Sequence, residues 1–340
     1  MIGRYCRLWL VLLGCVMFTS VASAQATPLA LSERTDVHAF IQYMVKKHHF
    51  KESYLKRILD EVRLKPDVIA RIKKPAESFP WNRYAKIFLT PERVKLGAKF
   101  WKEHAATLER AERTYGVPAS MIVAIIGIES FYGKRQGTYR VVDSLATLAF
   151  NYPPRSAFFR KELEQFLVMT REQKMDPFVP RGSYAGAIGQ PQFMPSSFRA
   201  YAVDFDGDGH KDLNRSVDDV IGSVANYFKQ HGWQVGQPVA TAANVEGQAY
   251  QGLKFHFEPH YKLATLEKFG VKPGQHVADL AASIIKLSDK PTPEVWLGFH
   301  NFYVITRYNH SMLYAMAAHQ LQRRIAEAHT TLLDGVSSSA

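Results

Sequence analysis

Residues 121–134 read MIVAIIGIESFYGK, an almost entirely apolar stretch with one carboxylate, Glu129, near its end. The stretch follows Pro118, a residue favoured in the first turn of a helix, and runs into Gly133, a residue favoured just after the last turn. Its apolar side chains leave no polar stripe, and a helix that is apolar all round is buried. The pattern therefore predicts a buried helix over 118–132, with Glu129 in its last turn.

The position of Glu129 predicts either a reactive acid or a structural ion pair. Burial disfavours the charged form of a carboxyl group and raises its pKa. A glutamic acid that stays protonated near neutral pH can protonate a glycosidic oxygen, as the acid of lysozyme does. Alternatively, Glu129 pairs with Lys134 or Arg135 or caps a neighbouring helix, because buried charges are normally paired.

A second carboxylate is the usual partner of such an acid in glycosidases. Four acidic residues follow Glu129 at moderate distance, but none of them lies in a comparably apolar stretch. A mechanism with a single acid therefore remains open. The four residues are Asp143, Glu162, Glu164 and Asp176.

Helical patterns surround the buried helix on both sides. Apolar residues recur with helical spacing over 36–72, and 90–116 predicts one long amphipathic helix with Thr90 as its N-cap. Further helices are predicted over 155–173, 216–232 and 311–328. Between the last two, residues 235–297 are rich in Val, Thr, Tyr, Phe and Gly in short alternation, which predicts a small β insertion.

The chain of 340 residues is long enough for more than one domain, and its 46% apolar content is that of a globular protein. The predicted fold class is α+β and mainly α. The predicted division is a signal peptide at 1–24, an N-terminal helical domain at 25–116, a catalytic core at 117–234, the β insertion at 235–297, and a C-terminal helical part at 298–332 that returns to the core.

The first residues predict export. Arg4 and Arg7 precede the apolar run LWLVLLGCVMF, and small residues then lead to Ala24, which is the pattern of a signal peptide cleaved after Ala24. The sequence LLGC also resembles a bacterial lipoprotein signal, and in that case Cys15 is lipidated and anchors the protein. A transmembrane helix is the third interpretation, but the segment is short and ends in small residues.

Cysteine content and charge narrow the partners. Both cysteines, Cys6 and Cys15, lie in this leader, so the mature chain has no disulfide and no cysteine metal site. The net charge of +12 becomes +10 once Arg4 and Arg7 are removed. An exported basic protein suits an anionic polymer such as a cell wall that carries peptide carboxylates. Nucleic acid, the usual alternative, is disfavoured by export and by the lack of a long basic tract.

The sequence DFDGDGHKDLNRSVDD, residues 204–219, predicts a cation site. Its acidic residues alternate as in the first half of an EF-hand loop, with Asp204, Asp206 and Asp208 at positions 1, 3 and 5. A glycine follows at position 6, and His210 at position 7 would give its backbone oxygen. Ca²⁺ prefers such oxygen ligands. The ion's predicted role is structural, because it would bring the loop onto the next helix.

The second half of the loop departs from the EF-hand pattern. Arg215 occupies position 12, where a bidentate glutamate is expected. Asp218 or Asp219, at the start of the next helix, would close the site instead, and Asp218 is preferred. Asp212 at position 9 would bind directly or through water. The alternative is a turn rich in aspartate that holds no metal.

Five segments together resemble the B-type lytic murein transglycosylases. They are IESFYGK, LATLAFNYPPR, GSYAGAIGQPQFMPSSFRAYAVDFDGDG, GSVANYFKQHGW and NFYVITRYNH, and the resemblance spans residues 36–328. It implies a lysozyme-like helical core with an additional α domain and a small β domain. It also implies an enzyme that cleaves the MurNAc–GlcNAc bond of peptidoglycan without adding water and leaves a 1,6-anhydromuramoyl end.

The resemblance also implies roles for single residues. Glu129 matches the catalytic acid, which would protonate the leaving oxygen and then take the proton of the attacking C6 hydroxyl. Arg155 would meet a peptide carboxylate, although Pro154 stands where relatives often carry a second basic residue. The residues that would line the saccharide groove are Tyr84, Ser183, Gln192, Phe193, Met194, Tyr227, Tyr308, Asn309 and Tyr314.

Two other functions stay open. A muramidase that adds water would be told apart by its product, and a calcium-stabilised wall-binding protein on the same fold would release nothing. The expected partners are peptidoglycan glycan strands and cell-wall synthesis proteins, without nucleic acid, and the expected state is a monomer. The expected location is the periplasm, or the outer membrane if Cys15 is lipidated.

Overall fold

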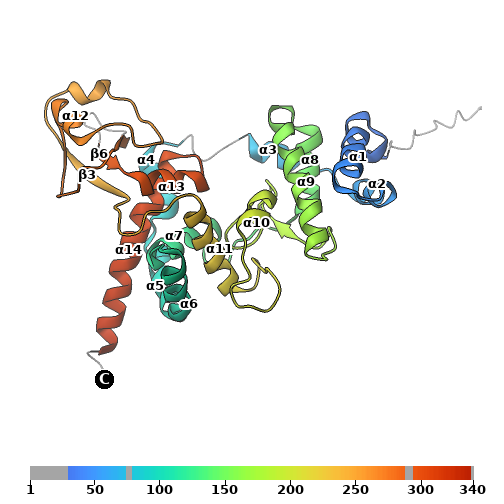
Figure 1. Cartoon of the computed structure of the whole chain (residues 1–340), viewed down its shortest axis with the longest axis horizontal. Helices are drawn as coiled ribbons and strands as arrows, with labels where there is room; N and C mark the ends of the chain where they lie inside the picture. The colour runs from blue at the N-terminus through green and yellow to red at the C-terminus, as the bar shows by residue number, and fades with distance from the viewer. Residues whose placement is uncertain (1–29, 74–78, 288–293, 338–340) are drawn as a thin grey trace, which may run out of the picture.

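The computed structural model describes residues 30–73, 79–287 and 294–337 (Figure 1). The predicted leader, with its candidate lipidation site Cys15, lies outside the described residues. The described chain is mostly helical and carries two small antiparallel sheets, which confirms the predicted class, α+β and mainly α. None of the helices described is at once long enough and apolar enough to cross a membrane.

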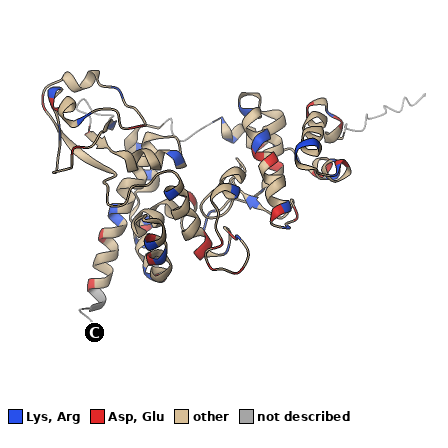
Figure 2. Ribbon diagram, viewed as in Figure 1, with Lys and Arg blue, Asp and Glu red and all other residues tan. Residues whose placement is uncertain are grey.

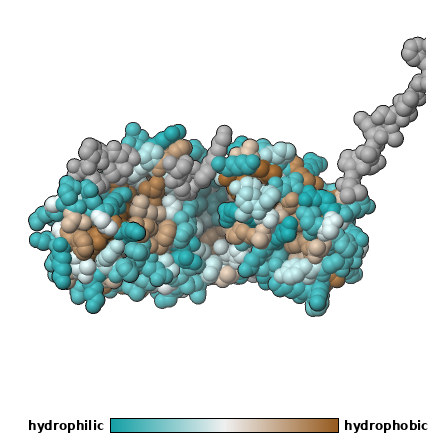
Figure 3. Space-filling model, turned by 90° about the horizontal axis from the view of Figure 1, so that it is seen from above, coloured by the Kyte–Doolittle hydropathy of each residue, from teal (hydrophilic) through white to brown (hydrophobic). Residues whose placement is uncertain are grey.

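The helices pack into two groups joined by a narrower middle (Figures 1 and 3). The first group contains α1 (Thr35–His48), α2 (Glu52–Glu61), α3 (Pro66–Ile72), α8 (Val141–Asn151) and α9 (Ser156–Glu172). The second contains α4 (Trp81–Phe88), α5 (Pro91–Glu103), α6 (Ala105–Tyr115), α7 (Ala119–Ser130), α11 (Val217–Gln230), α13 (His300–Tyr308) and α14 (Met312–Ser337). Helix α10 (Pro195–Tyr201) contacts α9 of the first group and α11 of the second.

Helix α7 is the centre of the second group and is buried, as the sequence predicts. All residues from Met121 to Ile128 are buried, and the helix contacts α5, α6, α11 and α14. A helix with no polar stripe needs neighbours on every side, because each uncovered apolar side chain would stay in contact with water. The cover thus comes from segments on both sides of α7 in the sequence.

The helices of the predicted domain 25–116 belong to both groups. Helices α1 to α3 pack in the first group with α8 and α9, whereas α4 to α6 pack in the second. Packing therefore separates these helices between α3 and α4, and the predicted domain bounds stay a prediction.

The single long helix predicted over 90–116 is wrong. Helix α5 ends at Glu103 and α6 begins at Ala105, with His104 between them outside the helical region at φ −118° and ψ 26°. The ring of His104 packs on Phe100 with 4.6 Å between ring centroids. The break lets α5 pack on α7 and α14 while α6 packs on α11. Histidine is not a helix breaker, so tertiary packing decides this boundary.

The β-rich segment predicted over 235–297 contains a four-stranded antiparallel sheet. Its strands are β3 (Ala240–Val245), β4 (Val271–Pro273), β5 (Ser283–Leu287) and β6 (Glu294–Gly298), in the order β4-β3-β6-β5. Helix α12 (Leu263–Lys268) and 3₁₀ helix η4 (Ala249–Gly252) cover it and share a second apolar cluster that includes Leu266 and Ile284. The sheet therefore has a small core of its own.

A two-stranded sheet links the first group to the loop before α10. It pairs β1 (Tyr139–Arg140), just before α8, with β2 (Arg181–Gly182). Two further 3₁₀ helices, η1 (Leu31–Glu33) and η3 (Pro153–Arg155), precede α1 and α9. The loop over residues 183–194 thus starts at a fixed sheet and ends at α10, between the two groups.

Candidate active site

Glu129 lies in the last turn of α7 and is partly exposed, whereas all other residues from Met121 to Ser130 are buried. The helix then stops at two bulky residues with left-handed backbone, Phe131 at φ 53° and Tyr132 at φ 58°. The side chain of Ser130 accepts a hydrogen bond of 3.0 Å from the N–H of Gly133 and closes the turn. The carboxylate is therefore presented at the rim of the apolar core, within reach of a substrate.

The Tyr314 hydroxyl donates a hydrogen bond of 2.5 Å to the carboxylate of Glu129. Tyr314 is buried in the first turn of α14, and burial together with the charge of Glu129 raises its pKa well above the usual value. The phenol therefore stays protonated and acts as a donor, which stabilises the charged form of the carboxylate. The side chains of Lys134 and Arg135, the alternative partners of Glu129, lie 5.8 and 4.8 Å from the ring of Phe131.

An aromatic cluster continues from Tyr314. The ring of Tyr308 stacks on Tyr314 at 6.4 Å and lies 4.7 Å from the ring of Tyr227. Phe193 lies against both, at 5.6 Å from Tyr227 and 5.9 Å from Tyr308. The structure thus brings four predicted groove residues from α11, α13, α14 and the loop 183–194 together beside Glu129.

Two hydroxyl groups of this cluster bind backbone oxygens of the protein. The hydroxyl of Tyr227 donates to the backbone oxygen of Arg307, and that of Tyr308 to the backbone oxygen of Pro191, each at 2.6 Å. Phe193 is only 2% exposed and packs against both tyrosines, so its direct contact with a sugar stays a prediction.

The other groove predictions fall into different settings. Tyr84 is 1% exposed and packs on Phe88 at 5.1 Å, so its ring belongs to the core of the second group. Asn309 follows Tyr308 at the end of α13 and is partly exposed. Arg155 lies in η3 of the first group, is exposed, and covers the ring of Phe158 at 4.4 Å.

The polar residues of the loop 183–194 hold the loop itself. The hydroxyl oxygen of Ser183 accepts from the N–H groups of Ala185 and Ala187, at 3.3 and 3.1 Å. The amide nitrogen of Gln192 donates to the backbone oxygens of Gly189 and Gln136, at 2.8 and 3.1 Å. Met194 is partly buried and precedes α10. Direct contact of Ser183, Gln192 or Met194 with a sugar therefore stays a prediction.

The four carboxylates that follow Glu129 have other partners. Asp143 accepts from Arg140 at 2.8 Å, and Asp176 accepts from a backbone N–H at 2.9 Å. The buried Glu162 accepts from a serine hydroxyl and N–H, and the buried Glu164 from tyrosine, lysine and histidine side chains. The buried Asp143, Glu162 and Glu164 are thus committed to holding the fold, whereas the exposed Asp176 closes a local turn.

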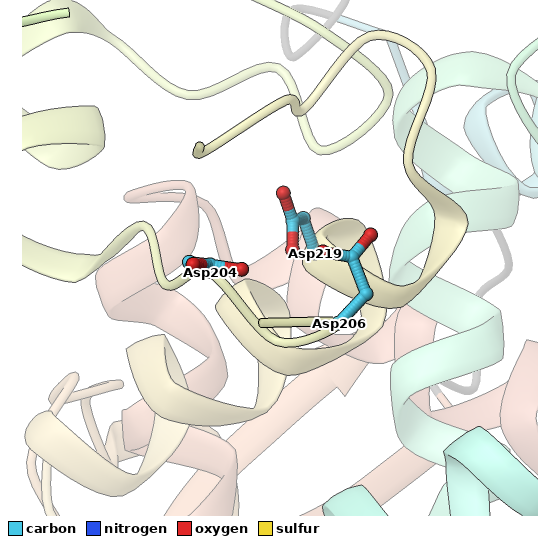
Figure 4. Close-up of side chains that lie close together, drawn as sticks. All are labelled: Asp204, Asp206 and Asp219. Atoms are coloured by element: carbon cyan, nitrogen blue, oxygen red, sulfur yellow. The ribbon is translucent and has the colours of Figure 1, made fainter. Parts of the chain in front are cut away.

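The acidic loop brings three carboxylates together (Figure 4). One oxygen from each of Asp204, Asp206 and Asp219 lies within 4.8 Å of the others. Asp219 is 1% exposed, and its oxygens accept from the N–H groups of Phe205 and Asp212 at 2.6 and 2.7 Å. Burial and the charge of Asp206 raise the pKa of Asp219, while the hydroxyl of Ser216 lowers the pKa of Asp206.

The preference for Asp218 over Asp219 is wrong. The carboxylate of Asp218 accepts a hydrogen bond of 2.6 Å from the Thr107 hydroxyl of α6, away from the other acids. Neighbouring helical residues point about 100° apart, so only one of the pair can face the loop. The hydroxyl of Ser216 caps α11 by accepting from the N–H of Asp219, which turns that residue back toward the loop.

Two further carboxylates of the loop, the exposed Asp208 and the half-buried Asp212, hold turns of the backbone. The carboxylate of Asp208 is not part of the cluster of three and accepts from the N–H of His210 at 2.8 Å. Asp212 accepts from the N–H groups of Asn214 and Arg215 and so closes a turn. A donor set made only of oxygen, with like charges crowded and one of them buried, nevertheless fits a hard divalent cation such as Ca²⁺.

Comparison with known proteins agrees with this geometry. Residues 32–323 match the family model described as the transglycosylase SLT domain. The chain is 45% identical over 300 residues to membrane-bound lytic murein transglycosylase B of Escherichia coli (strain K12), covering 85% of this chain and 82% of that protein.

Solved structures give the same result. The E. coli lytic transglycosylase Slt35 in complex with calcium is 44% identical, with a TM-score of 0.81 over 88% of this chain and 95% of that one. SltB3 from Pseudomonas aeruginosa in complex with NAG-anhNAM-pentapeptide is 32% identical, with a TM-score of 0.74 over 84% and 77%. The chain therefore belongs to the family of lytic transglycosylases that carry the transglycosylase SLT domain.

Proposed function

We propose that this lytic transglycosylase cleaves the β-1,4 bond between MurNAc and GlcNAc in peptidoglycan with Glu129 as its single acid and base. No water is added, and the muramoyl product ends in a 1,6-anhydro ring. Membership of the family supports the reaction class, and the relative SltB3 has been solved with an anhydro-muramoyl pentapeptide. The observation that carries the residue assignment is the partly exposed carboxyl group of Glu129 at the end of an apolar helix.

The chemistry needs one proton in each direction. Protonated Glu129 gives its proton to the glycosidic oxygen while the bond from C1 of MurNAc to that oxygen breaks, and GlcNAc leaves with a new hydroxyl. Positive charge develops at C1 and is eased by the sugar's own acetamido group. The C6 hydroxyl then attacks C1 and returns its proton to the Glu129 carboxylate. The intramolecular nucleophile has the proximity advantage of a well-placed neighbour.

Two features support a single acid. The candidates for a second carboxylate that follow Glu129 in the sequence accept hydrogen bonds elsewhere, as described above. The second feature is Tyr314, because its hydroxyl stabilises Glu129 as a carboxylate between the two proton transfers. A tyrosine with a raised pKa does not compete for the proton.

We assign the saccharide groove to the region around this pair. Tyr308, Asn309 and Met194 lie at partly exposed positions beside the aromatic cluster, where ring and thioether surfaces can cover the apolar faces of pyranoses. Tyr84, Phe193 and Tyr227 act mainly by holding that surface from within. Ser183 and Gln192 shape the loop and are the proposed hydrogen-bonding residues toward acetamido or hydroxyl groups.

The charge of the chain suits the peptides of the polymer. Lys and Arg, 43 in number against 31 Asp and Glu, are spread over both helix groups (Figure 2). Arg155 is exposed on the first group and is the proposed contact for a peptide carboxylate. Such spread charge attracts an anionic polymer without selecting one site on it.

The acidic loop is the proposed calcium site. Asp204, Asp206 and Asp219 would hold the ion, with Asp208 and the backbone oxygen of His210 as further ligands from the loop. Calcium would neutralise the crowded carboxylates and fix the loop on α11. Its role is structural, and the relative Slt35 has been solved with calcium.

The remaining proposals concern where the protein works. We assign it to the periplasm, after removal of residues 1–24 or attachment to the outer membrane through a lipid on Cys15. The related E. coli enzyme is called membrane-bound. A monomer that meets cell-wall synthesis proteins at the glycan strand is the proposed working state.

Mass spectrometry of the muropeptides released from purified peptidoglycan tests the proposed reaction, with wild type and Glu129→Gln measured side by side. Products that lack one water at the muramic end, absent with the variant, are expected. Reducing ends would instead mean a muramidase and would require a second carboxylate. Binding of the wall without release would mean a wall-binding protein. Full activity of Glu129→Gln would remove Glu129 from the mechanism.

A further inference from the structure

The turn that follows Glu129 needs an external hold. Phe131 and Tyr132 are both bulky and both have positive φ, at 53° and 58°. Glycine or asparagine takes such positions at little conformational cost, whereas larger side chains crowd the backbone there. A strained turn persists only where its surroundings fix it, and such turns gather at functional sites.

Arg93 supplies contacts on both sides of this turn. Arg93 lies in the first turn of α5 and is 5% exposed. Its Nε donates to the backbone oxygen of Gly127 at 3.0 Å, and one terminal nitrogen donates to the backbone oxygen of Ile87 at 2.5 Å. The guanidinium lies 4.9 Å from the centre of the Phe131 ring. A cation placed at the carbonyl end of α7 also suits the helix dipole.

The side chain of Tyr132 also contacts Arg93. Its hydroxyl donates to the backbone oxygen of Arg93 at 2.8 Å. The side chain fits only because two neighbours lack a Cβ atom: a Cβ at Gly97 or Gly127 would stand 2.5 or 2.6 Å from the Tyr132 hydroxyl oxygen. The tyrosine is thus inserted between α5 and α7.

We propose that Arg93 is a positioning residue for catalysis, which fixes the Glu129 carboxylate by holding Gly127 before it and Phe131 and Tyr132 after it. The inference rests on the proposed role of Glu129. Arg93 acts through the turn and is not required to touch the sugar. Since misplacing a reacting group by about 1 Å can lower a rate about a hundredfold, a small loosening of this turn is expected to appear in kcat.

The test uses two variants that remove little. Arg93→Lys keeps the charge but cannot reproduce the two guanidinium hydrogen bonds, and Tyr132→Phe removes one hydroxyl and keeps the ring. Initial rates on soluble glycan strands from purified peptidoglycan give kcat and KM, and calorimetry gives Tm. We expect kcat to fall about a hundredfold for Arg93→Lys and about tenfold for Tyr132→Phe, with KM within about twofold of wild type.

Arg171→Lys is the matched control. Arg171 makes the same kinds of contact in the first helix group, donating to the backbone oxygen of His48 and covering the ring of Phe50 at 4.1 Å. A loss of packing and hydrogen bonding there is expected to lower Tm and leave kcat unchanged. The double variant Arg93→Lys with Tyr132→Phe is expected to lose less activity than the product of the two single losses, because both act on one turn.

The outcomes separate this inference from the function beneath it. If Glu129→Gln is inactive while Tyr132→Phe and Arg93→Lys keep kcat within twofold, the positioning role is rejected and Glu129 stands. A fall in kcat that only follows the folded fraction at the assay temperature also rejects it. If Arg93→Lys does not fold, Tyr132→Phe alone decides by the same criterion. Full activity of Glu129→Gln overturns both proposals together.

Discussion

The end of α7 carries the carboxylate of Glu129 and the acidic loop carries several carboxylates, but the two regions use their glycines for different purposes. Under the Glu129 turn, Gly97 and Gly127 are needed because the side chain of Tyr132 fills the space of their missing Cβ atoms. In the acidic loop, Gly207 and Gly209 have φ of 80° and 89°, and a Cβ atom on either would meet no other atom within 4 Å. These two glycines therefore serve the turn of the backbone alone.

The difference teaches how each region is stabilised. The Glu129 turn is held by side chains of the core, so its geometry is present before any ligand binds. The acidic loop crowds three carboxylates and one of them is buried, so a bound cation would relieve the repulsion that loop N–H groups and the Ser216 hydroxyl balance in part. The comparison predicts that the first region sets the rate and the second sets stability.

The largest expected effect comes from Glu129→Gln. The amide keeps the size of the side chain but cannot donate or take the proton, so activity should fall between about 10²- and 10⁴-fold. Tm should change little, because Glu129 is partly exposed and the core of α7 remains intact. Rates of muropeptide release and a melting curve measured together check both halves. Glu162→Gln is the control, and it should lower Tm through the lost serine contact while the rate stays near wild type.

Calcium removal should have the opposite effect, lowering Tm while the rate changes little. A ligand present at about a hundred times its Kd stabilises the folded state by about 2.7 kcal/mol, so excess chelator should lower Tm by roughly 5 °C while the rate at 25 °C changes little. Calorimetry with chelator and with added calcium measures the shift. Asp219→Asn should abolish the response of Tm to calcium, and Asp218→Asn should keep it, because Asp218 bonds to Thr107. A Tm indifferent to calcium in the wild-type protein would refute the site.

The sequence predicts the buried helix and the position of Glu129 better than it predicts the turn that follows them. The buried helix over 118–132 and the position of Glu129 follow from an unbroken apolar pattern, which only complete burial explains. The left-handed turn at Phe131 and Tyr132 does not follow from the sequence pattern. Bulky residues ordinarily avoid positive φ, and the contact that holds these two comes from α5. The space for Tyr132 depends on two glycines on different helices, and no local pattern reports that they meet.

The same limit explains the two errors. His104 carries no breaking signal, so the division of 90–116 into α5 and α6 is set by the different partners of the two helices. Asp218 and Asp219 are adjacent and chemically alike, and only the contacts of their carboxylates, Asp218 with Thr107 of α6 and Asp219 with N–H groups of the loop, decide which one faces the loop. Pattern gives the type of each element, whereas tertiary contacts decide where it ends and which side chain points inward.

Acid should weaken the core through His319. His319 of α14 is 5% exposed, and burial, with the nearby charge of Arg323, lowers its pKa to about 4. The unfolded chain binds a proton below its ordinary pKa of 6.5 and the folded chain does not, so stability is lost as pH falls from 6.5 toward 4. At pH 5 the loss should be about 2 kcal/mol. Urea unfolding of wild type and His319→Gln at pH 7 and pH 5 measures it, and an equal change in both proteins would rule His319 out.

The smallest expected effect is that of Tyr314→Phe, because the lost hydroxyl acts on the two proton transfers in opposite directions. Without this donor the Glu129 carboxylate is less stabilised, so the first transfer to the glycosidic oxygen becomes harder and the return of the C6 proton becomes easier. The net change in kcat should therefore stay within about tenfold.

The pH dependence of Tyr314→Phe is the sharper measurement. A carboxyl group that has lost a donor keeps its proton to higher pH, so the alkaline fall in kcat should move upward. Tyr308→Phe is the control, since its hydroxyl binds the backbone oxygen of Pro191 and should leave the position of that fall unchanged. An unmoved profile in Tyr314→Phe would mean that the hydroxyl only packs the site, and the rate would then depend on the turn behind Glu129 alone.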